Sequence, residues 1–155
     1  MMTPDQWFTA YSKCHQHPIN KIIHCFAVPL IFISIAGLLW DIPRPSFFEF
    51  VPLLNWASVS LIFVMLFYFR LSVSLGIGML IFSVLTLLLI ALFDSLQIGP
   101  TWLASLILFG IMWVFQFIGH AIEGQKPAFF DDLKFLLIGP LWLLGFIYRR
   151  LGVPY

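Results

Sequence analysis

Residues 72–93 read SVSLGIGMLIFSVLTLLLIALF, an apolar run without a single charged side chain. An α-helix rises 1.5 Å per residue, so about 20 apolar residues are needed to cross the ~30 Å hydrocarbon layer of a bilayer. This run has that length, and three comparable apolar blocks accompany it along the chain. We therefore predict membrane-spanning helices at residues 22–40 (interrupted at Pro29), 50–69, 72–93 and 101–119, which is a bundle of four transmembrane helices.

The composition agrees with a membrane protein. Of the 155 residues, 61% are hydrophobic and only 10% are charged, whereas a soluble domain carries about 25% charged residues. The formal net charge of +1 excludes a nucleic-acid-binding protein, which would show a strong excess of clustered Lys and Arg. The expected product is an all-α membrane protein in which residues 1–155 form a single integral membrane domain.

The two ends of the chain add shorter segments to this bundle. Thr3 can cap a helix that starts at Pro4, and Gln6 completes a capping-box pattern. Asp5 stands where a signal peptide would carry basic residues, so we interpret this segment as an N-terminal interfacial helix. Residues 133–148 form a shorter C-terminal apolar stretch, which either crosses the membrane or is a re-entrant segment.

The distribution of Lys and Arg predicts the orientation, because short cytoplasmic loops carry the positive excess. An N-terminus inside places Lys13, Lys21, Arg70, Lys126 and Lys134 in the cytoplasm and leaves Arg44 outside. A re-entrant 133–148 segment keeps Arg149 and Arg150 on the cytoplasmic side too, and is therefore favoured over a full crossing. Cys14 and Cys25 fall on the same side and are expected to stay reduced.

The histidines are predicted to share one membrane face. They are His15, His17, His24 and His120. An even number of crossings separates the first three from the last, so all of them are expected on the cytoplasmic side. His24 lies at the entrance of the first span and His120 at the exit of the fourth, so the two approach each other if those helices are neighbours. Ionisable residues at membrane depth are costly and usually mark a functional site.

Polar side chains accompany the histidines at helical spacing. Asn20 precedes His24 by four residues, and Gln116, His120 and Glu123 follow one face of the fourth span. Neutral imidazoles near carboxylate and amide groups suit iron, zinc, copper or nickel. Glu123 either binds the metal or fixes the tautomer of a ligand imidazole, whereas Asn20 and Gln116 suit hydrogen bonding around the site. The candidate ligands are His15, His24 and His120, with His17 as a candidate fourth ligand.

Two motifs resemble a known family. Residues 11–29 read YSKCHQHPINKIIHCFAVP, and the matching positions are Tyr11, His15, Pro18, Asn20, Ile23, His24 and Pro29. Residues 116–128 read QFIGHAIEGQKPA. Together with the order of the apolar blocks and the apolar tail after Pro127, these motifs resemble the small multi-span membrane dioxygenases of phytosphingosine and 2-hydroxy fatty acid breakdown, known in fungi and bacteria.

The resemblance implies an iron(II)-dependent α-oxidation within sphingolipid metabolism, in which a 2-hydroxy fatty acid reacts with dioxygen and loses one carbon. The metal-site histidines that it implies are His15, His24 and His120, with Asn20 and Glu123 in the same motifs. His17 stands where family members often have Asn, and Ser95 where some fungal members have His, so either His17 compensates as a ligand or this site has one ligand fewer. As a hypothesis, the acyl tail lies between helices in the lipid phase while the headgroup meets iron at the cytoplasmic surface.

Three other interpretations stay open. A zinc-dependent membrane lipid hydrolase would use the same histidines to activate water. A haem-binding protein would use His24 and His120 as axial ligands. A non-enzymatic structural protein would need no metal, since a single histidine at a helix end is most often a packing residue. For Glu123, a solvated ion pair with Lys126 competes with a role at the metal.

Overall fold

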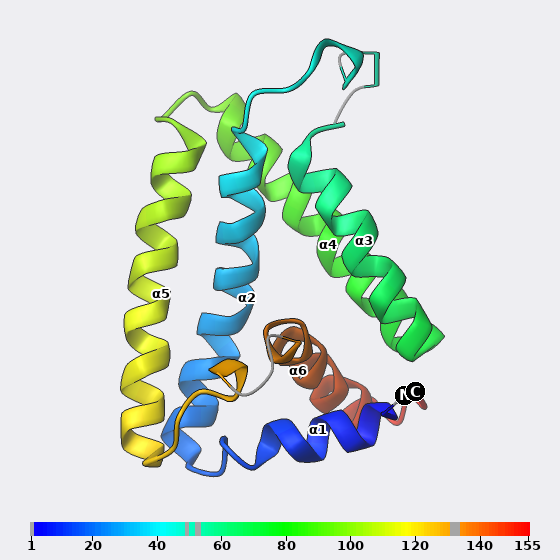
Figure 1. Ribbon diagram of the computed structural model, residues 1–155, viewed down its shortest axis with the longest axis vertical. Coiled ribbons are helices and arrows are strands. Elements are labelled where there is room, and N and C mark those ends of the chain that lie inside the picture. The colour runs from blue at the N-terminus through cyan, green and yellow to red at the C-terminus, as the bar shows by residue number, and fades with distance from the viewer. Residues whose placement is uncertain (1, 49, 52–53, 131–133) are drawn as a thin grey trace.

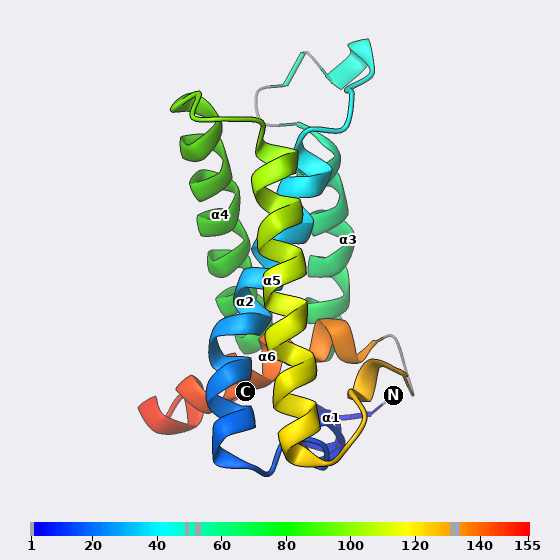
Figure 2. The ribbon, with the colours of Figure 1, turned by 90° about the vertical axis from the view of Figure 1, so that its left-hand side faces the viewer.

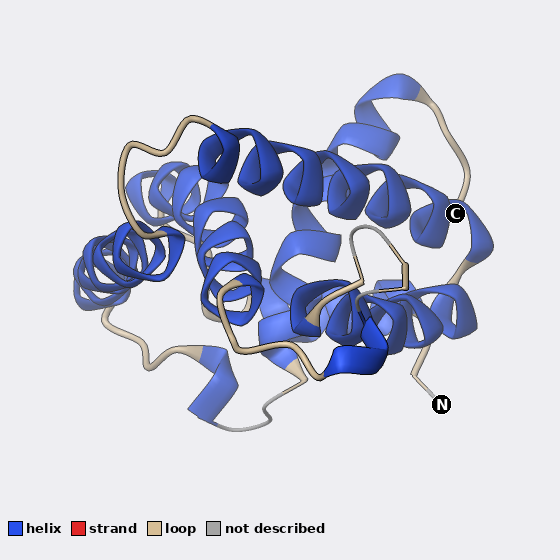
Figure 3. Cartoon of the chain, turned by 90° about the horizontal axis from the view of Figure 1, so that it is seen from above, coloured by secondary structure: helices blue, strands red, loops and turns tan. Residues whose placement is uncertain are grey.

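The computed structural model describes residues 2–48, 50–51, 54–130 and 134–155, which contain helices and turns but no strand (Figure 1, Figure 3). The helices are α1 (Pro4–Ser12), α2 (Pro18–Trp40), α3 (Trp56–Leu71), α4 (Val73–Ser95), α5 (Thr101–Glu123) and α6 (Phe135–Leu151). Two short 3-10 helices, η1 (Ser46–Phe48) and η2 (Ala128–Phe130), lie in connecting segments. The prediction of an all-α protein is confirmed.

Three helices are long and apolar enough to cross a membrane. These are α2, α4 and α5, with 23 residues each. Large apolar side chains cover their outer faces: Phe26 on α2 is 68% exposed, Leu85 on α4 is 58% exposed and Val114 on α5 is 58% exposed. A continuous exposed apolar surface suits contact with lipid, so the helices indicate a membrane protein.

The helix in the second predicted span is shorter than expected. It was predicted to begin at residue 50, but α3 begins at Trp56 and has 16 residues, which corresponds to ~24 Å at 1.5 Å per residue. Asn55 sets this boundary, because its side chain accepts the backbone N–H of Ser58 at 3.0 Å and the Ser58 hydroxyl accepts the N–H of Asn55 at 3.0 Å. This capping box stops the helix although the apolar sequence continues upstream. Residues 52–53 of the predicted span lie outside the described residues, and a fourth full-length span is not confirmed.

The first predicted span is longer than expected and is not interrupted. Helix α2 starts at Pro18, where the fixed backbone of proline suits the first helical position, and runs to Trp40. It continues through Pro29, which was predicted to interrupt it. Proline is tolerated inside membrane helices when neighbouring helices pack around the missing hydrogen bond. Helix α5 lies against α2 along its length, as the two views in Figure 1 and Figure 2 show.

Small residues allow α2 and α5 to pack closely. A Cβ added at Gly37 of α2 would collide with Ser105 of α5, and a Cβ added at Gly119 of α5 would collide with Asn20 of α2. Close approach at small residues is a common way for membrane helices to associate. These two points lie towards opposite ends of the pair, so the contact is maintained along most of both helices. The first and fourth predicted spans are therefore neighbours, as the prediction of converging histidines required.

Helices α1 and α6 lie across one end of the bundle. Figure 1 shows α6 nearly end-on, whereas α2 to α5 run up the page. A shorter C-terminal apolar segment was predicted at residues 133–148, and α6 is a helix there that packs against the apolar face of α1. Its crossing or re-entry of the membrane stays a prediction. Phe8 is 3% exposed, Trp142 is 2% exposed, and the Trp142 ring N–H donates to the Ser12 hydroxyl at 2.9 Å. Residue 133, where the stretch was predicted to begin, lies outside the described residues.

Candidate metal centre

His15, His24 and His120 come together at one end of the bundle from three different segments. His15 follows α1 in the connection to α2, His24 lies in the second turn of α2, and His120 lies in the last turn of α5. The ring centroids of His15 and His24 are 4.3 Å apart, and each lies 4.9 Å from the His120 centroid. One nitrogen from each ring lies within 4.8 Å of the others. The structure thus joins the three histidines that the sequence singled out as ligands.

Backbone groups orient the three imidazole rings. Nδ1 of His15 lies 2.7 Å from the carbonyl oxygen of Tyr11, and Nδ1 of His24 lies 3.0 Å from the carbonyl oxygen of Asn20. A carbonyl oxygen can only accept, so each Nδ1 carries the proton and each Nε2 keeps its lone pair. The His120 ring hydrogen-bonds to the backbone of Gln125. Backbone acceptors of this kind commonly orient metal-binding histidines.

The remaining ring nitrogens face one another in a buried space. Nε2 of His15, Nε2 of His24 and Nδ1 of His120 are buried and have no hydrogen-bond partner among the described residues. An unpaired buried acceptor costs about 1–3 kcal/mol, so a partner that binds all three would stabilise the site. A divalent transition metal would satisfy all three, and neutral imidazoles are the form that binds it. Burial lowers the pKa of His15 to about 4, so this ring is neutral at physiological pH. The donor set therefore fits an iron or zinc ion.

The Glu123 carboxylate accepts hydrogen bonds from the connection between α1 and α2, beside the histidine cluster. Its Oε1 accepts the backbone N–H of Gln16 at 2.8 Å. Its Oε2 accepts the N–H of His17 at 2.8 Å and a side-chain N–H of Asn20 at 3.1 Å. These three bonds tie the connection that carries His15 to the end of α5. Sequence reasoning considered Glu123 as a metal ligand, an imidazole partner or a partner of a lysine, and did not find this contact with the loop.

The hydrogen bonds from Gln16, His17 and Asn20 to the Glu123 carboxylate form a clamp, and Asn20 connects this clamp to the histidines. Its side chain is fully buried, and Nδ2 donates to the carbonyl of Cys14 at 3.2 Å as well as to Glu123. Its backbone carbonyl orients His24. The carboxamide lies against Gly119, where any larger residue would displace it. Asn20 therefore has the hydrogen-bonding role that its amide group suggested, with backbone and carboxylate partners.

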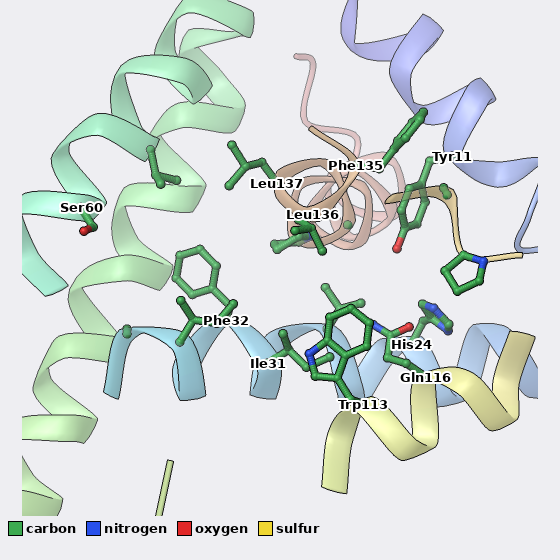
Figure 4. Close-up of a pocket in the computed structure, with 18 of the residues that line it drawn as sticks. Tyr11, His24, Ile31, Phe32, Ser60, Trp113, Gln116, Phe135, Leu136 and Leu137 are labelled. Atoms are coloured by element: carbon green, nitrogen blue, oxygen red, sulfur yellow. The ribbon is translucent and has the colours of Figure 1, made fainter. Parts of the chain in front are cut away.

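Two other predicted residues lie beside the cluster. His17 is partly exposed and caps α2, because its Nδ1 accepts the N–H of Ile19 at 3.2 Å. It is not one of the three grouped histidines. Gln116 is partly buried on α5, and Figure 4 shows its carboxamide beside His24 at the cavity.

Two aromatic residues at the site were missed as site residues by sequence reasoning. The Tyr11 ring stacks on His15, with centroids 4.1 Å apart and planes at 10°. Burial raises the pKa of the Tyr11 phenol above its usual range, so the hydroxyl stays protonated and can donate. The Trp142 centroid lies 5.8 Å from that of His15. The four-residue spacing from Tyr11 to His15 was a usable signal, whereas Trp142 reaches the site only through the tertiary packing of α6.

A cavity of about 220 Å³ opens from the histidine cluster into the bundle. Its polar lining gathers at one end, where Tyr11, His24 and Gln116 lie together in Figure 4. Away from this end the lining is apolar apart from Ser60 and the ring N–H of Trp113, and it comes from α2, α3, α5 and α6. A cavity with a polar head and an apolar body has the shape and chemistry to hold an amphiphile.

Comparisons with known proteins agree with the resemblance of the two histidine motifs. Residues 1–151 match the family model described as 2-hydroxy-palmitic acid dioxygenase Mpo1-like. The 2-hydroxy-palmitic acid dioxygenase MPO1 of Saccharomyces cerevisiae is 33% identical over 145 residues, which cover 92% of this chain and 78% of the yeast protein. No solved structure matches the chain. With a match over nearly its whole length, this chain belongs to the Mpo1-like family.

Proposed function

We propose that this protein is a non-haem iron(II)-dependent dioxygenase that converts 2-hydroxy fatty acids to fatty acids one carbon shorter. The yeast relative is named for a 2-hydroxy-palmitic acid dioxygenase activity, and the family model carries the same description. The observation that carries the proposal is the set of three unpartnered, buried imidazole nitrogens at the polar head of an apolar cavity. The overall reaction balances as 2-hydroxy acid plus dioxygen giving the shorter acid, carbon dioxide and water.

His15, His24 and His120 would hold the iron. Bound there, iron(II) would activate dioxygen, while the four electrons that reduce it would come from the 2-hydroxy acid. Three protein ligands leave coordination positions free, as non-haem iron oxygenases require. The backbone carbonyls of Tyr11 and Asn20 keep the ring protons of His15 and His24 on Nδ1, so both Nε2 lone pairs stay directed at the metal position.

Other groups at the cavity head would orient the substrate. The protonated Tyr11 hydroxyl and the Gln116 amide can donate to the carboxylate or the 2-hydroxyl of an acid that enters the cavity. Trp142 and Phe135 cover the side of Tyr11 and limit the access of water. The apolar body of the cavity would receive the acyl tail.

The distribution of positive charge supports a proposal for which side of the membrane the site faces. Lys13, Lys21 and Lys126 lie near the same end of the chain's bundle as the histidines, and positive residues favour the cytoplasmic side of a membrane. We therefore propose that the N-terminus and the histidine cluster face the cytoplasm, where the enzyme takes its substrate from membrane lipid metabolism.

The proposal is tested by turnover with defined metals. Detergent-purified protein is loaded anaerobically with iron(II) or with zinc and then given 2-hydroxypalmitate or, separately, a lipid ester, with and without oxygen. We expect pentadecanoic acid, detected by mass spectrometry, with iron and oxygen together. The variant His24→Ala should lose this activity, while the matched control His17→Asn keeps the helix cap and the activity. Oxygen-independent hydrolysis of a lipid ester by the zinc form, without α-oxidation by the iron form, would favour the hydrolase instead.

A further inference from the structure

The cavity at the histidine cluster continues along one face of α2 for most of the helix. Its lining on this helix recurs at His24, Val28, Ile31, Ile35 and Leu39, at spacings of three or four residues that keep the side chains on one face. From the first to the last of these residues the face extends ~22 Å, at 1.5 Å per residue. Half of the ~30 Å hydrocarbon layer, the part that one lipid tail fills, is only ~15 Å. The cavity is therefore long enough for a long acyl chain.

The cavity is also narrow. A volume of about 220 Å³ spread along this length leaves no space for two acyl chains side by side. The lining between the two ends is mainly apolar, with Phe32 from α2, Val64 from α3 and Leu137 from α6. Figure 4 shows the polar residues His24 and Gln116 at one end and Ser60 at the other.

The end remote from the histidines is formed where α2 meets the start of α3. Ala36 and Ala57 are 4% and 0% exposed and belong to one packed cluster with Ile90 of α4. Leu39 and Ser60, both partly buried, complete this end of the lining. The small side chains of Ala57 and Ser60 leave space that a larger residue would fill.

We propose that this end of the cavity, formed by Ala36, Leu39, Ala57 and Ser60, sets the longest acyl chain that the site accepts. The carboxyl end of the substrate lies at the histidine cluster, and the tail runs along α2 inside the protein. The residues at the junction of α2 and α3 then limit the length of the acyl chain, because a tail that reaches this end cannot extend further. The inference rests on the proposed function, which supplies an acyl substrate with its tail in the cavity, and it adds which residues limit the length of that tail.

The test uses one variant that shortens the cavity and one that lengthens it. Ser60→Leu places a branched side chain in the lumen, and Leu39→Ala removes one. Ala104→Leu is the matched control, since Ala104 is partly buried near the start of α5 and does not line the cavity. Iron-loaded protein receives an equimolar mixture of 2-hydroxylaurate, 2-hydroxypalmitate and 2-hydroxylignocerate, and the ratio of products is measured. Binding of the same acids under nitrogen is measured separately by native mass spectrometry.

Ser60→Leu should shift preference towards the shorter acids and Leu39→Ala towards the longer ones. Each methylene that no longer fits costs about fourfold in affinity, so loss of two or three gives on the order of tenfold or more. The same shifts should appear in anaerobic binding. Unchanged ratios in both variants, with an active wild type, would overturn the inference and place the tail in the surrounding lipid. If Ser60→Leu does not fold, the result for Leu39→Ala decides alone. A wild type that neither binds nor oxidises any of the acids would instead contradict the proposed function.

Discussion

The clamp made by Glu123 offers a sharp test of how the site is held together. Replacing Glu123 by Gln keeps the size of the side chain but leaves only one oxygen that can accept. The carboxylate now accepts from Gln16, His17 and Asn20 on its two oxygens. Whichever way the new amide turns, its NH₂ group faces at least one N–H donor, so at least one bond is lost and a donor is left facing a donor.

The magnitude follows from the bond that is lost. A hydrogen bond to a charged group contributes about 1.5–3 kcal/mol, and Glu123 is partly exposed, which favours the lower part of this range. A loss of about 2 kcal/mol lowers the melting temperature of a domain of this size by about 4–8 °C. The connection that carries His15 also loosens, and loss of such supporting contacts typically lowers metal affinity about 10- to 100-fold.

The assay compares melting temperature and metal affinity in detergent. Glu123→Gln should melt earlier than the wild type and bind iron(II) more weakly. The control is Asp5→Asn, which also removes a carboxylate but at an exposed position in α1, and should change neither quantity by more than a small amount. A Glu123→Gln protein that melts and binds metal like the wild type would refute the idea that this carboxylate holds the His15 connection in place.

Three further predictions concern packing, pH and metal. Gly119→Ala should push the Asn20 carboxamide out of place and destabilise the protein by about 1–3 kcal/mol, whereas Gly110→Ala on the same helix meets open space and should be neutral or slightly stabilising in thermal unfolding. The metal-free protein should lose stability as the pH falls from about 6.5 towards 4. The reason is that His15 gains a proton near pH 6.5 in the unfolded chain but, with its pKa of about 4, not in the folded protein. A melting temperature that stays constant across this range would contradict the prediction. Removing metal with a chelator should lower the melting temperature, and iron(II) at about 100 times its dissociation constant should restore about 2.7 kcal/mol, a gain that is expected to be absent in His24→Ala.

The sequence predicts the helices well where apolar length decides the structure. The run at residues 72–93 became α4 almost unchanged, because nothing interrupts its hydropathy. The start of α3 was misplaced, because the capping box at Asn55 overrides apolar residues that precede it. The position of α6 was not predictable from hydropathy, since it depends on contacts between distant residues such as Trp142 and Ser12.

The histidines were found because their convergence depends on simple features. His24 and His120 lie at helix ends on the same side of the bundle. The number of predicted crossings between them is even, and this number can be counted from the apolar blocks of the sequence. The clamp was missed because Glu123 and Gln16 are 107 residues apart and the bond uses a backbone N–H, which has no signature in the sequence. Sequence reasoning therefore finds the groups that carry chemistry more readily than the backbone groups that hold them.

The most direct test of the central claim is the metal content of the protein. Wild type, His120→Ala and His17→Asn are purified in parallel under nitrogen, without added metal, and analysed for all transition metals. We predict about one iron ion per chain in the wild type and in His17→Asn, and its loss in His120→Ala, since three imidazoles are needed to hold the ion. A wild type without metal, or a His120→Ala protein that keeps its iron, would contradict the proposed centre.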